Sequence, residues 1–210
     1  MKFSMTLSAG LALAGITTAA PVVARGDTSA AGIIGQIAPD SKSCASSTEC
    51  RTNVQAAPFL IDAMAKYGLR APGQIAAVLA LTAYESRNYQ YKHNTDPGRP
   101  GQGTSNMQMI NYNIEYAKSI PELKDKVAAL GDITTTDKQN QLLALVNTDE
   151  YNFGSGPWFL TTQCSKDVVD GLAAGTDAAF SAYMGCVGVS VTGDRQAYWT
   201  RAKQAFGLGA

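Results

Sequence analysis

The sequence carries little charge, and its two signs cancel. Charged residues make up 16% of the 210 positions, and 17 Lys and Arg balance 17 Asp and Glu, whereas globular chains average about 25% charged residues. A neutral chain creates no long-range field for holding a polyanion or an anionic bilayer. We therefore expect neither nucleic acid nor membrane as a partner. The length suits one domain, and we expect a monomer.

Histidine is almost absent, because His93 is the only one in the chain. No C-x-x-C pair occurs either, so a four-ligand zinc site cannot be assembled with its usual spacing. We expect no metal and no cofactor. The surroundings of His93 favour a loop histidine satisfied by water or a neighbour over a catalytic base.

Long apolar runs are missing beyond the first twenty residues. Met1 and Lys2 precede an apolar stretch at 7–16 and small residues up to position 20, the pattern of a secretory signal peptide. The alternative is a membrane anchor, but the run breaks at Thr17 and Pro21, short of the roughly 20 residues that a span needs. The sequence predicts that 1–20 are removed and that the protein is secreted and extracellular.

The cysteines are few and even in number. In an oxidising compartment, Cys44, Cys50, Cys164 and Cys186 favour two disulfides over thiol chemistry. Four cysteines allow three connectivities. We favour Cys44 with Cys50 and Cys164 with Cys186, because each pair is local in sequence.

Apolar spacing predicts a mainly helical domain of the α+β kind at 44–210, after a flexible polar segment at 21–43. Pro72 opens one helix at its first turn. The predicted helices cover 55–68, the segment from 72 to about 85, 114–118, 122–130, 137–147, 166–174, 177–184 and 194–206.

One segment, 91–110, departs from the helical pattern. It is rich in turn residues, including Asp96-Pro97-Gly98, and it ends in strand-like alternation at 106–110. We therefore expect a small β-hairpin inserted between helices.

Glu85 is the strongest candidate for chemistry. It follows Ile75, Val78 and Thr82 on the apolar face of its helix, at the C-terminal end. An apolar environment and the negative end of the helix dipole both raise a carboxyl pKa, which suits a general acid. The alternative is an exposed glutamate paired with Arg87.

Four short motifs in order resemble the lysozyme-like superfamily. Tyr-Glu-Ser at 84–86, followed by Gly-Thr-Ser-Asn-Met-Gln-Met-Ile at 103–110, resembles goose-type lysozymes and lytic transglycosylases. The segments 108–113, 156–160 and 194–199 resemble family 19 chitinases. The overall likeness is to small secreted fungal lysozyme-type (muramidase) domains. Ile110 departs from the pattern, since many goose-type enzymes have an aspartate there.

The resemblance implies a lysozyme-like catalytic domain at 44–210, with the hairpin lining a cleft. It further implies a secreted glycoside hydrolase that cleaves β-1,4 linkages of peptidoglycan, with Glu85 as general acid and a polysaccharide as partner. A chitinase, a lytic transglycosylase and a non-catalytic carbohydrate-binding secreted effector are the alternatives.

The second carboxylate that glycoside hydrolysis usually needs is Asp96, which we expect to activate water and give an inverting reaction. The alternative is an ordinary turn aspartate. Amide and aromatic side chains suit sugar hydroxyls and sugar faces. The candidate substrate-binding residues are Gln108, Asn111, Tyr112, Tyr91 and Trp158. For Trp158 a core position stays open, and for Phe159 we favour the core.

Overall fold

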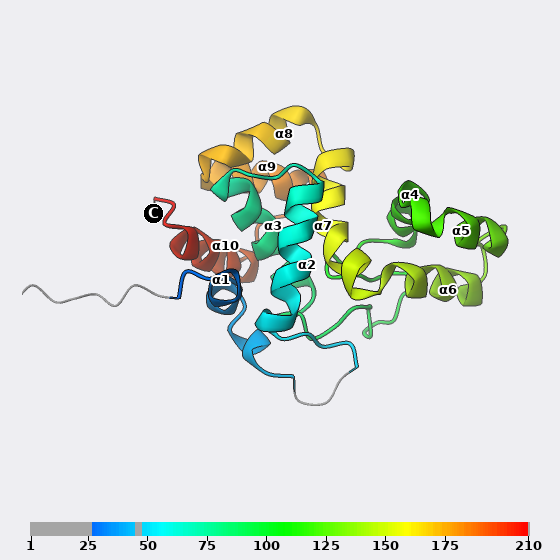
Figure 1. Ribbon diagram of the computed structural model, residues 1–210. Helices are drawn as coiled ribbons and strands as arrows, with labels where there is room; N and C mark the ends of the chain where they lie inside the picture. The colour runs from blue at the N-terminus through cyan, green and yellow to red at the C-terminus, as the bar shows by residue number, and fades with distance from the viewer. Residues whose placement is uncertain (1–26, 45–47, 210) are drawn as a thin grey trace, which may run out of the picture.

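The computed structural model describes residues 27–44 and 48–209, and it is mainly helical, as the sequence predicted (Figure 1). The predicted signal peptide at 1–20 lies outside the described residues. The elements are α1 (Ala30–Ile37), η1 (Pro39–Lys42), α2 (Asn53–Lys66), α3 (Pro72–Glu85), α4 (Ile110–Ser119), η2 (Pro121–Leu123), α5 (Lys124–Leu130), α6 (Thr136–Val146), α7 (Asp149–Gln163), α8 (Lys166–Gly171), η3 (Leu172–Ala174), α9 (Asp177–Val187) and α10 (Gly193–Phe206).

Helix α3 lies in the main core. It begins at Pro72, whose fixed φ suits the first helical turn. Ala76, Ala77 and Ala80 are buried, and such small side chains let neighbouring helices approach closely. Helices α1, α2, α7 and α10 all pack against α3 or one another here. This packing fixes the C-terminal end of α3, where Glu85 lies.

A second apolar cluster joins α4, α5 and α6, which lie to one side of the main bundle (Figure 1). Helix α7 serves both clusters, since Phe153 and Leu160 belong to the main core and Trp158 and Phe159 to the second. Helix α7 was not among the helices predicted from the sequence. Its interior Pro157 and two glycines hide the helical pattern, and burial on all sides removes an amphipathic face.

The segment 21–43 was predicted to be flexible. Its described part is mostly helical, since it contains α1 and η1. Ser29 caps α1 by accepting the backbone N–H of Gly32 at 3.0 Å. Ile34 and Ile37 are buried in the main core. Two large apolar side chains on one short helix give this segment enough burial to fold onto α2 and α10.

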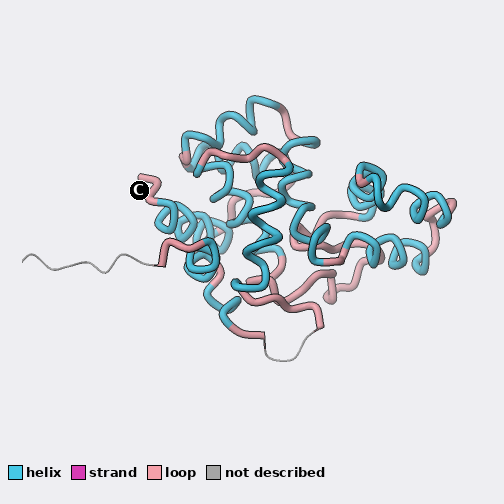
Figure 2. Tube along the Cα trace, viewed as in Figure 1, coloured by secondary structure: helices cyan, strands magenta, loops and turns pink. Residues whose placement is uncertain are grey.

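The predicted β-hairpin is not present as paired strands in the described residues. Only isolated bridges join His93 to Gly103 and Gly103 to Gln108, and residues 86–109 run as a long loop (Figure 2). Thr104 and Met107 have positive φ, which interrupts an extended strand. Ile110, expected in the strand, begins α4.

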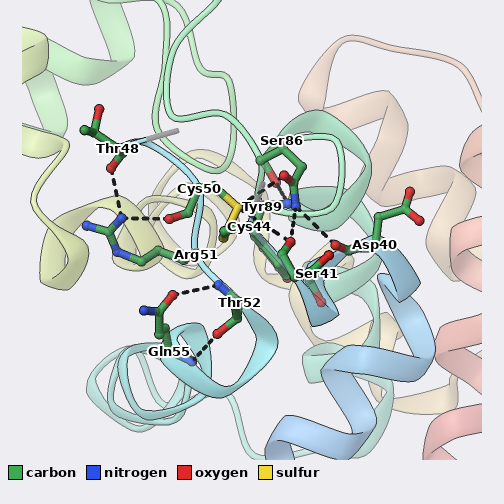
Figure 3. Close-up of a disulfide and its surroundings, with 12 residues drawn as sticks. Asp40, Ser41, Cys44, Thr48, Cys50, Arg51, Thr52, Gln55, Ser86 and Tyr89 are labelled. Atoms are coloured by element: carbon green, nitrogen blue, oxygen red, sulfur yellow. Dashed lines mark hydrogen bonds between the residues drawn. A yellow bond between two sulfur atoms is a disulfide. The ribbon is translucent and has the colours of Figure 1, made fainter. Parts of the chain in front are cut away.

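Both disulfides have the pairing that the sequence favoured, Cys44–Cys50 and Cys164–Cys186. Figure 3 shows the first of them beside η1 and the turn that contains Ser86 and Tyr89. Gln90 strengthens this junction, since its side-chain amide donates to the backbone oxygens of Asp40 and Ser43, both at 3.2 Å. In the described part of the chain, no helix has the length and apolar character that crossing a membrane requires.

Candidate functional site

A small cavity lies where α3 ends and the 86–109 loop begins. Its volume is about 160 Å³. We call it the Glu85 cavity, and its walls include Glu85, Tyr91, His93, Asp96, Gln102 and Met107. All of these except Glu85 come from the loop, so the loop supplies most of the walls and α3 supplies the candidate acid.

The carboxyl of Glu85 is only 21% exposed and is paired with Arg195 of α10. Arg195 Nη2 donates to Glu85 Oε1 at 3.0 Å. Burial raises the pKa of Glu85, and the hydrogen bond and positive charge of Arg195 oppose that rise without cancelling it. The rise in the pKa of Glu85 agrees with the expectation from the sequence. The cation that pairs with Glu85 is Arg195 and not Arg87.

Arg195 is itself held by an aromatic ring. Its guanidinium lies 4.5 Å from the ring centre of Tyr84, which makes an edge contact with Tyr198. The Nε of Arg195 is buried and has no hydrogen-bond partner among the described residues. Buried donors in proteins are hydrogen-bonded, so this Nε donates to a water or to a ligand.

Tyr183 of α9 is a second buried polar group near Glu85. Burial raises the pKa of its phenol, and the negative charge of Glu85 raises it further. Its hydroxyl has no hydrogen-bond partner within the described chain. Glu85 therefore lies among groups whose hydrogen-bonding capacity is not fully used.

The loop around the cavity has an unusual backbone. Within the described residues, those with positive φ other than glycine are Arg87 (49°), Asn88 (59°), Tyr89 (60°), Thr104 (65°) and Met107 (45°). All five lie in the 86–109 loop. Left-handed backbone at bulky residues costs about 1–3 kcal/mol each and clusters at functional sites, so the surrounding contacts must hold it in place.

Those contacts come partly from Ser86. Its hydroxyl donates to the Thr82 carbonyl at 2.6 Å and accepts the Tyr89 N–H at 3.0 Å. The Arg51 N–H donates to the Tyr89 carbonyl at 3.0 Å from the other side. The turn after Glu85 is thus fixed by both α3 and the segment after the first disulfide.

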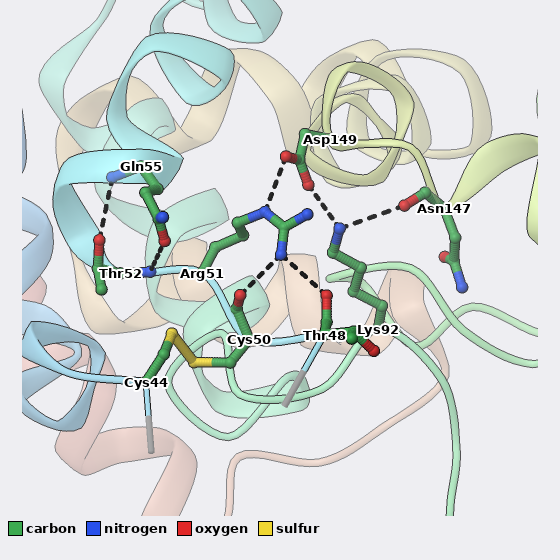
Figure 4. A network of polar contacts seen from close by, with 9 residues as sticks. All are labelled: Cys44, Thr48, Cys50, Arg51, Thr52, Gln55, Lys92, Asn147 and Asp149. Atoms are coloured by element: carbon green, nitrogen blue, oxygen red, sulfur yellow. Dashed lines mark hydrogen bonds and ion pairs between the residues drawn. A yellow bond between two sulfur atoms is a disulfide. The ribbon is translucent and has the colours of Figure 1, made fainter. Parts of the chain in front are cut away.

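An ionic network anchors the same loop to α7 (Figure 4). Asp149 accepts from Arg51 Nε at 2.7 Å and also pairs with Lys92, whose side chain is only 9% exposed. Burial by itself would raise the pKa of Asp149, but hydrogen bonds from Arg51 and Lys92 outweigh it and lower the pKa. Asp149 therefore ties two distant segments together as a carboxylate.

The structure brings only some of the predicted site residues together. Glu85, Asp96 and Tyr91 line one cavity. Asp96 is exposed on its turn, and Tyr91 lies 5.9 Å from the Arg87 guanidinium.

The other four predicted residues lie elsewhere. Gln108 is buried and donates to Asn113 Oδ1 at 2.8 Å. Asn111 is exposed on α4, and Tyr112 packs edge-on against Phe159 at 4.8 Å between ring centres. Trp158 is 3% exposed and is a core residue. Gln108, Tyr112 and Trp158 therefore serve packing and internal hydrogen bonds.

Two features of the site were not predicted from the sequence. Arg195 was noted in its motif, but nothing in the sequence indicated that it pairs with Glu85. His93 is a loop histidine satisfied by a neighbour, as predicted, because its Nδ1 pairs with Glu49. Its place in the wall of the Glu85 cavity was not predicted. The only available signal was the histidine's position eight residues after the candidate acid.

A larger, apolar cavity of about 470 Å³ lies apart from these residues, among α1, α2, α3 and the end of α10. Ile34, Leu60, Met64 and Leu79 form its buried walls. Arg70, which is exposed, is the cation among its lining residues. Such a surface suits the apolar part of an organic ligand.

The chain is similar to the bifunctional dioxygenase (DOX)-epoxy alcohol synthase (EAS) of Fusarium oxysporum (strain Fo5176). The two are 50% identical over 157 residues, which are 73% of this chain and 12% of that protein. The chain therefore spans only a small part of the length of this relative. No protein-family model matches the chain, and no solved structure matches it.

This similarity contradicts the lysozyme-like resemblance. The relative is named as a dioxygenase and epoxy alcohol synthase, so the predicted glycoside hydrolase class and peptidoglycan cleavage are wrong, together with the glycan-directed alternatives. The physical reason lies in the motifs, which are three to eight residues long and occur in proteins of other functions. Gln108 bonds inside the protein and Trp158 fills the core, so neither faces the Glu85 cavity.

The donor set does not fit an oxygen-activating metal. Non-haem iron oxygenases hold the metal with two histidines and a carboxylate, and haem iron takes a histidine or thiolate ligand. In 27–44 and 48–209, no group of three His, Cys, Asp or Glu side chains could hold a metal ion. The four cysteines are in disulfides, so none is a thiolate ligand, and the single histidine of the sequence cannot supply the two that non-haem iron takes. We therefore derive no oxygen-activating step in this chain.

Proposed function

We propose that this chain performs acid–base chemistry on an oxygenated organic substrate, with Glu85 as the general acid. The observation that carries this proposal is the partly buried Glu85 carboxyl at the wall of a small cavity. Its burial raises its pKa. A carboxyl with a raised pKa holds its proton to higher pH than an ordinary glutamate and can donate it to a substrate oxygen. Arg195 orients the carboxyl from the other side.

The proposed substrate class is an epoxy alcohol, because the relative's name includes epoxy alcohol synthase. Glu85 gives its proton to the epoxide oxygen as that carbon–oxygen bond breaks. The neighbouring hydroxyl of the same molecule loses its proton to a base, and its oxygen forms the new carbon–oxygen bond. The product is an isomeric epoxy alcohol, so no oxidant or reductant is consumed. A cavity of about 160 Å³ suits the reacting group of such a molecule.

The test uses the purified chain and a chiral epoxy alcohol whose hydroxyl carbon adjoins the epoxide. Proton NMR follows the interconversion of the two isomers. We expect the wild type to accelerate it and Glu85→Gln to lose about 100-fold, the usual share of a general acid. Glu115→Gln, an exposed change on α4, is the matched control and should keep full activity. Equal rates for wild type and Glu85→Gln would overturn the proposal.

The apolar cavity favours a second candidate function, the binding of an amphipathic carboxylate without chemistry. Its apolar walls suit a hydrocarbon chain, and Arg70 at its edge suits an acidic head group. Displacement of an apolar fluorescent probe by a long-chain carboxylate tests it. Arg70→Gln should weaken displacement and Glu85→Gln should not, whereas the reverse pattern would argue against this candidate.

We also propose that the protein works in an oxidising, extracellular compartment. The support is the full pairing of the four cysteines in two disulfides. Mass spectrometry of alkylated protein from culture medium and from cell lysate tests it. We expect the unalkylated, disulfide-bonded form in the medium, and a reduced form confined to the lysate would contradict the proposal.

A further inference from the structure

The histidine of the Glu85 cavity has a carboxylate partner. His93 Nδ1 lies against Oε1 of Glu49, and the imidazole is 43% exposed. His93 and Glu85 line the same cavity. Glu49 contacts the imidazole at Nδ1.

Glu49 is held in place by its neighbours. Its Oε2 accepts the Lys92 backbone N–H at 3.2 Å. It directly precedes Cys50 of the first disulfide and then Arg51, whose Nη1 donates to the carbonyls of Thr48 at 3.0 Å and Cys50 at 2.8 Å (Figure 4). The disulfide and the Arg51 bonds thus fix the segment that presents the Glu49 carboxylate.

The pairing determines where the imidazole keeps its proton. A ring nitrogen close to a carboxylate oxygen carries a proton, because two lone pairs facing each other would repel. In a neutral imidazole with the proton on Nδ1, Nε2 has a free lone pair and can accept a proton. A carboxylate on one nitrogen also fixes the orientation of the ring.

We propose that His93 is the general base of the Glu85 cavity and that Glu49 is its positioning residue. This inference rests on the proposed function and names the base that it requires. The substrate hydroxyl gives its proton to His93 Nε2 as its oxygen forms the new carbon–oxygen bond, and Glu85 protonates the epoxide oxygen that leaves. Solvent then takes the proton from the imidazolium and returns one to Glu85, so the site is restored.

Asp96 is the competing base on the same cavity, but it is less suited. Its side chain is exposed, and no hydrogen bond within the described chain orients it. A base needs a fixed direction toward the proton that it takes. His93 has that direction from Glu49, whereas Asp96 lies on a turn without a comparable partner.

A tautomer measurement tests the pairing without any activity assay. Because the chain has one histidine, nitrogen–proton correlation NMR at alkaline pH shows a single imidazole. We expect the proton on Nδ1 in the wild type and in Glu115→Met, and a shift toward Nε2 in Glu49→Met, which keeps side-chain volume but removes the acceptor. A wild-type proton on Nε2, or no change in Glu49→Met, would overturn the dyad.

Isomerisation rates then test the role of the base. We expect His93→Gln to lose about 100-fold and Asp96→Asn to lose less than about 3-fold, since general bases contribute about 10²–10⁴-fold. Thermal melting checks that each variant folds. If His93→Gln keeps the activity that Glu85→Gln loses, the base assignment is wrong and the acid assignment stands. If the wild type itself is inactive, the proposed function fails, whatever the tautomer.

Discussion

Arg195 donates a hydrogen bond to Glu85 across 3.0 Å, although 110 residues separate the two in sequence. The contact joins the start of α10 to the end of α3. The guanidinium of Arg195 also lies 4.5 Å from the centre of the Tyr84 ring. A fixed cation beside a half-buried carboxyl limits how far burial can raise the pKa of that carboxyl. The protonation of Glu85 therefore depends on the packing of these two helices.

Removing the Arg195 charge should raise the pKa of Glu85 further, because Arg195 lowers it. We expect a clear rise in Arg195→Met and a small change in Arg195→Lys, which keeps the charge. Carbon NMR of glutamate-labelled protein, titrated with pH, measures the pKa of each carboxyl. An unchanged Glu85 titration in Arg195→Met would contradict the pairing.

Glu85 should make stability depend on pH in a particular direction. Its native pKa lies above the ordinary value of 4.5, so between these two values the native state binds more protons than the unfolded state. Stability contributed by this group is therefore present below about pH 4.5 and is lost as pH rises through the native pKa. Urea unfolding of wild type and Glu85→Gln over a pH series measures this contribution. The free energy of unfolding of the wild type, relative to that of Glu85→Gln, should fall as pH rises. A difference that grows would show the opposite shift.

Asp149→Asn should destabilise the protein by about 2 kcal/mol at neutral pH, since it weakens two charged hydrogen bonds and leaves Lys92 without its carboxylate. The pKa of Asp149 is lowered from 3.8, so its contribution is present above that value and is lost as pH falls through the lower native pKa. Urea unfolding at neutral and acidic pH checks both statements. Asp167→Asn, an exposed change on α8, is the control and should have little effect.

The two disulfides should differ in what they contribute to stability. Cys164–Cys186 spans 22 positions and Cys44–Cys50 spans 6. On the loop-entropy account these closures stabilise by about 3 and about 2 kcal/mol respectively. Paired replacement of each by alanine, followed by urea unfolding, gives the two values. A larger loss for the shorter loop would mean that Cys44–Cys50 acts mainly through the contacts it fixes.

Two helical glycines should respond in opposite ways to alanine. A Cβ on Gly73 of α3 would lie 2.1 Å from the Leu172 carbonyl oxygen, while a Cβ on Gly185 of α9 would meet nothing within 4 Å. We expect Gly73→Ala to cost more than about 2 kcal/mol through this clash. Gly185→Ala should stabilise by about 0.5–1 kcal/mol, because alanine favours helix. Thermal melting of the pair decides, and similar melting temperatures would contradict the close approach of α3 to η3.

Local signals in the sequence were enough for much of the helical framework. Pro72 begins α3 as predicted. Gly68, the last residue of the predicted helix at 55–68, follows α2 with a φ of 70°, the left-handed conformation typical of a helix end. Both effects act within one or two helical turns, so they can be predicted from neighbouring residues. The same short-range periodicity predicted the position of Glu85 on an apolar face. The burial that raises the pKa of its carboxyl comes from the packing of other elements around it.

The tertiary structure decided which residues surround Glu85. Arg195, Tyr183 and Glu49 reach the site or its histidine from other segments, and no periodic pattern encodes contacts over such separations. A tryptophan in the sequence is equally compatible with a substrate cleft and with a core. Only the packing of α7 against α4 and α6 places Trp158 in the core. Sequence spacing determines which face of an element is apolar, whereas the partner of a buried polar group depends on how the elements pack.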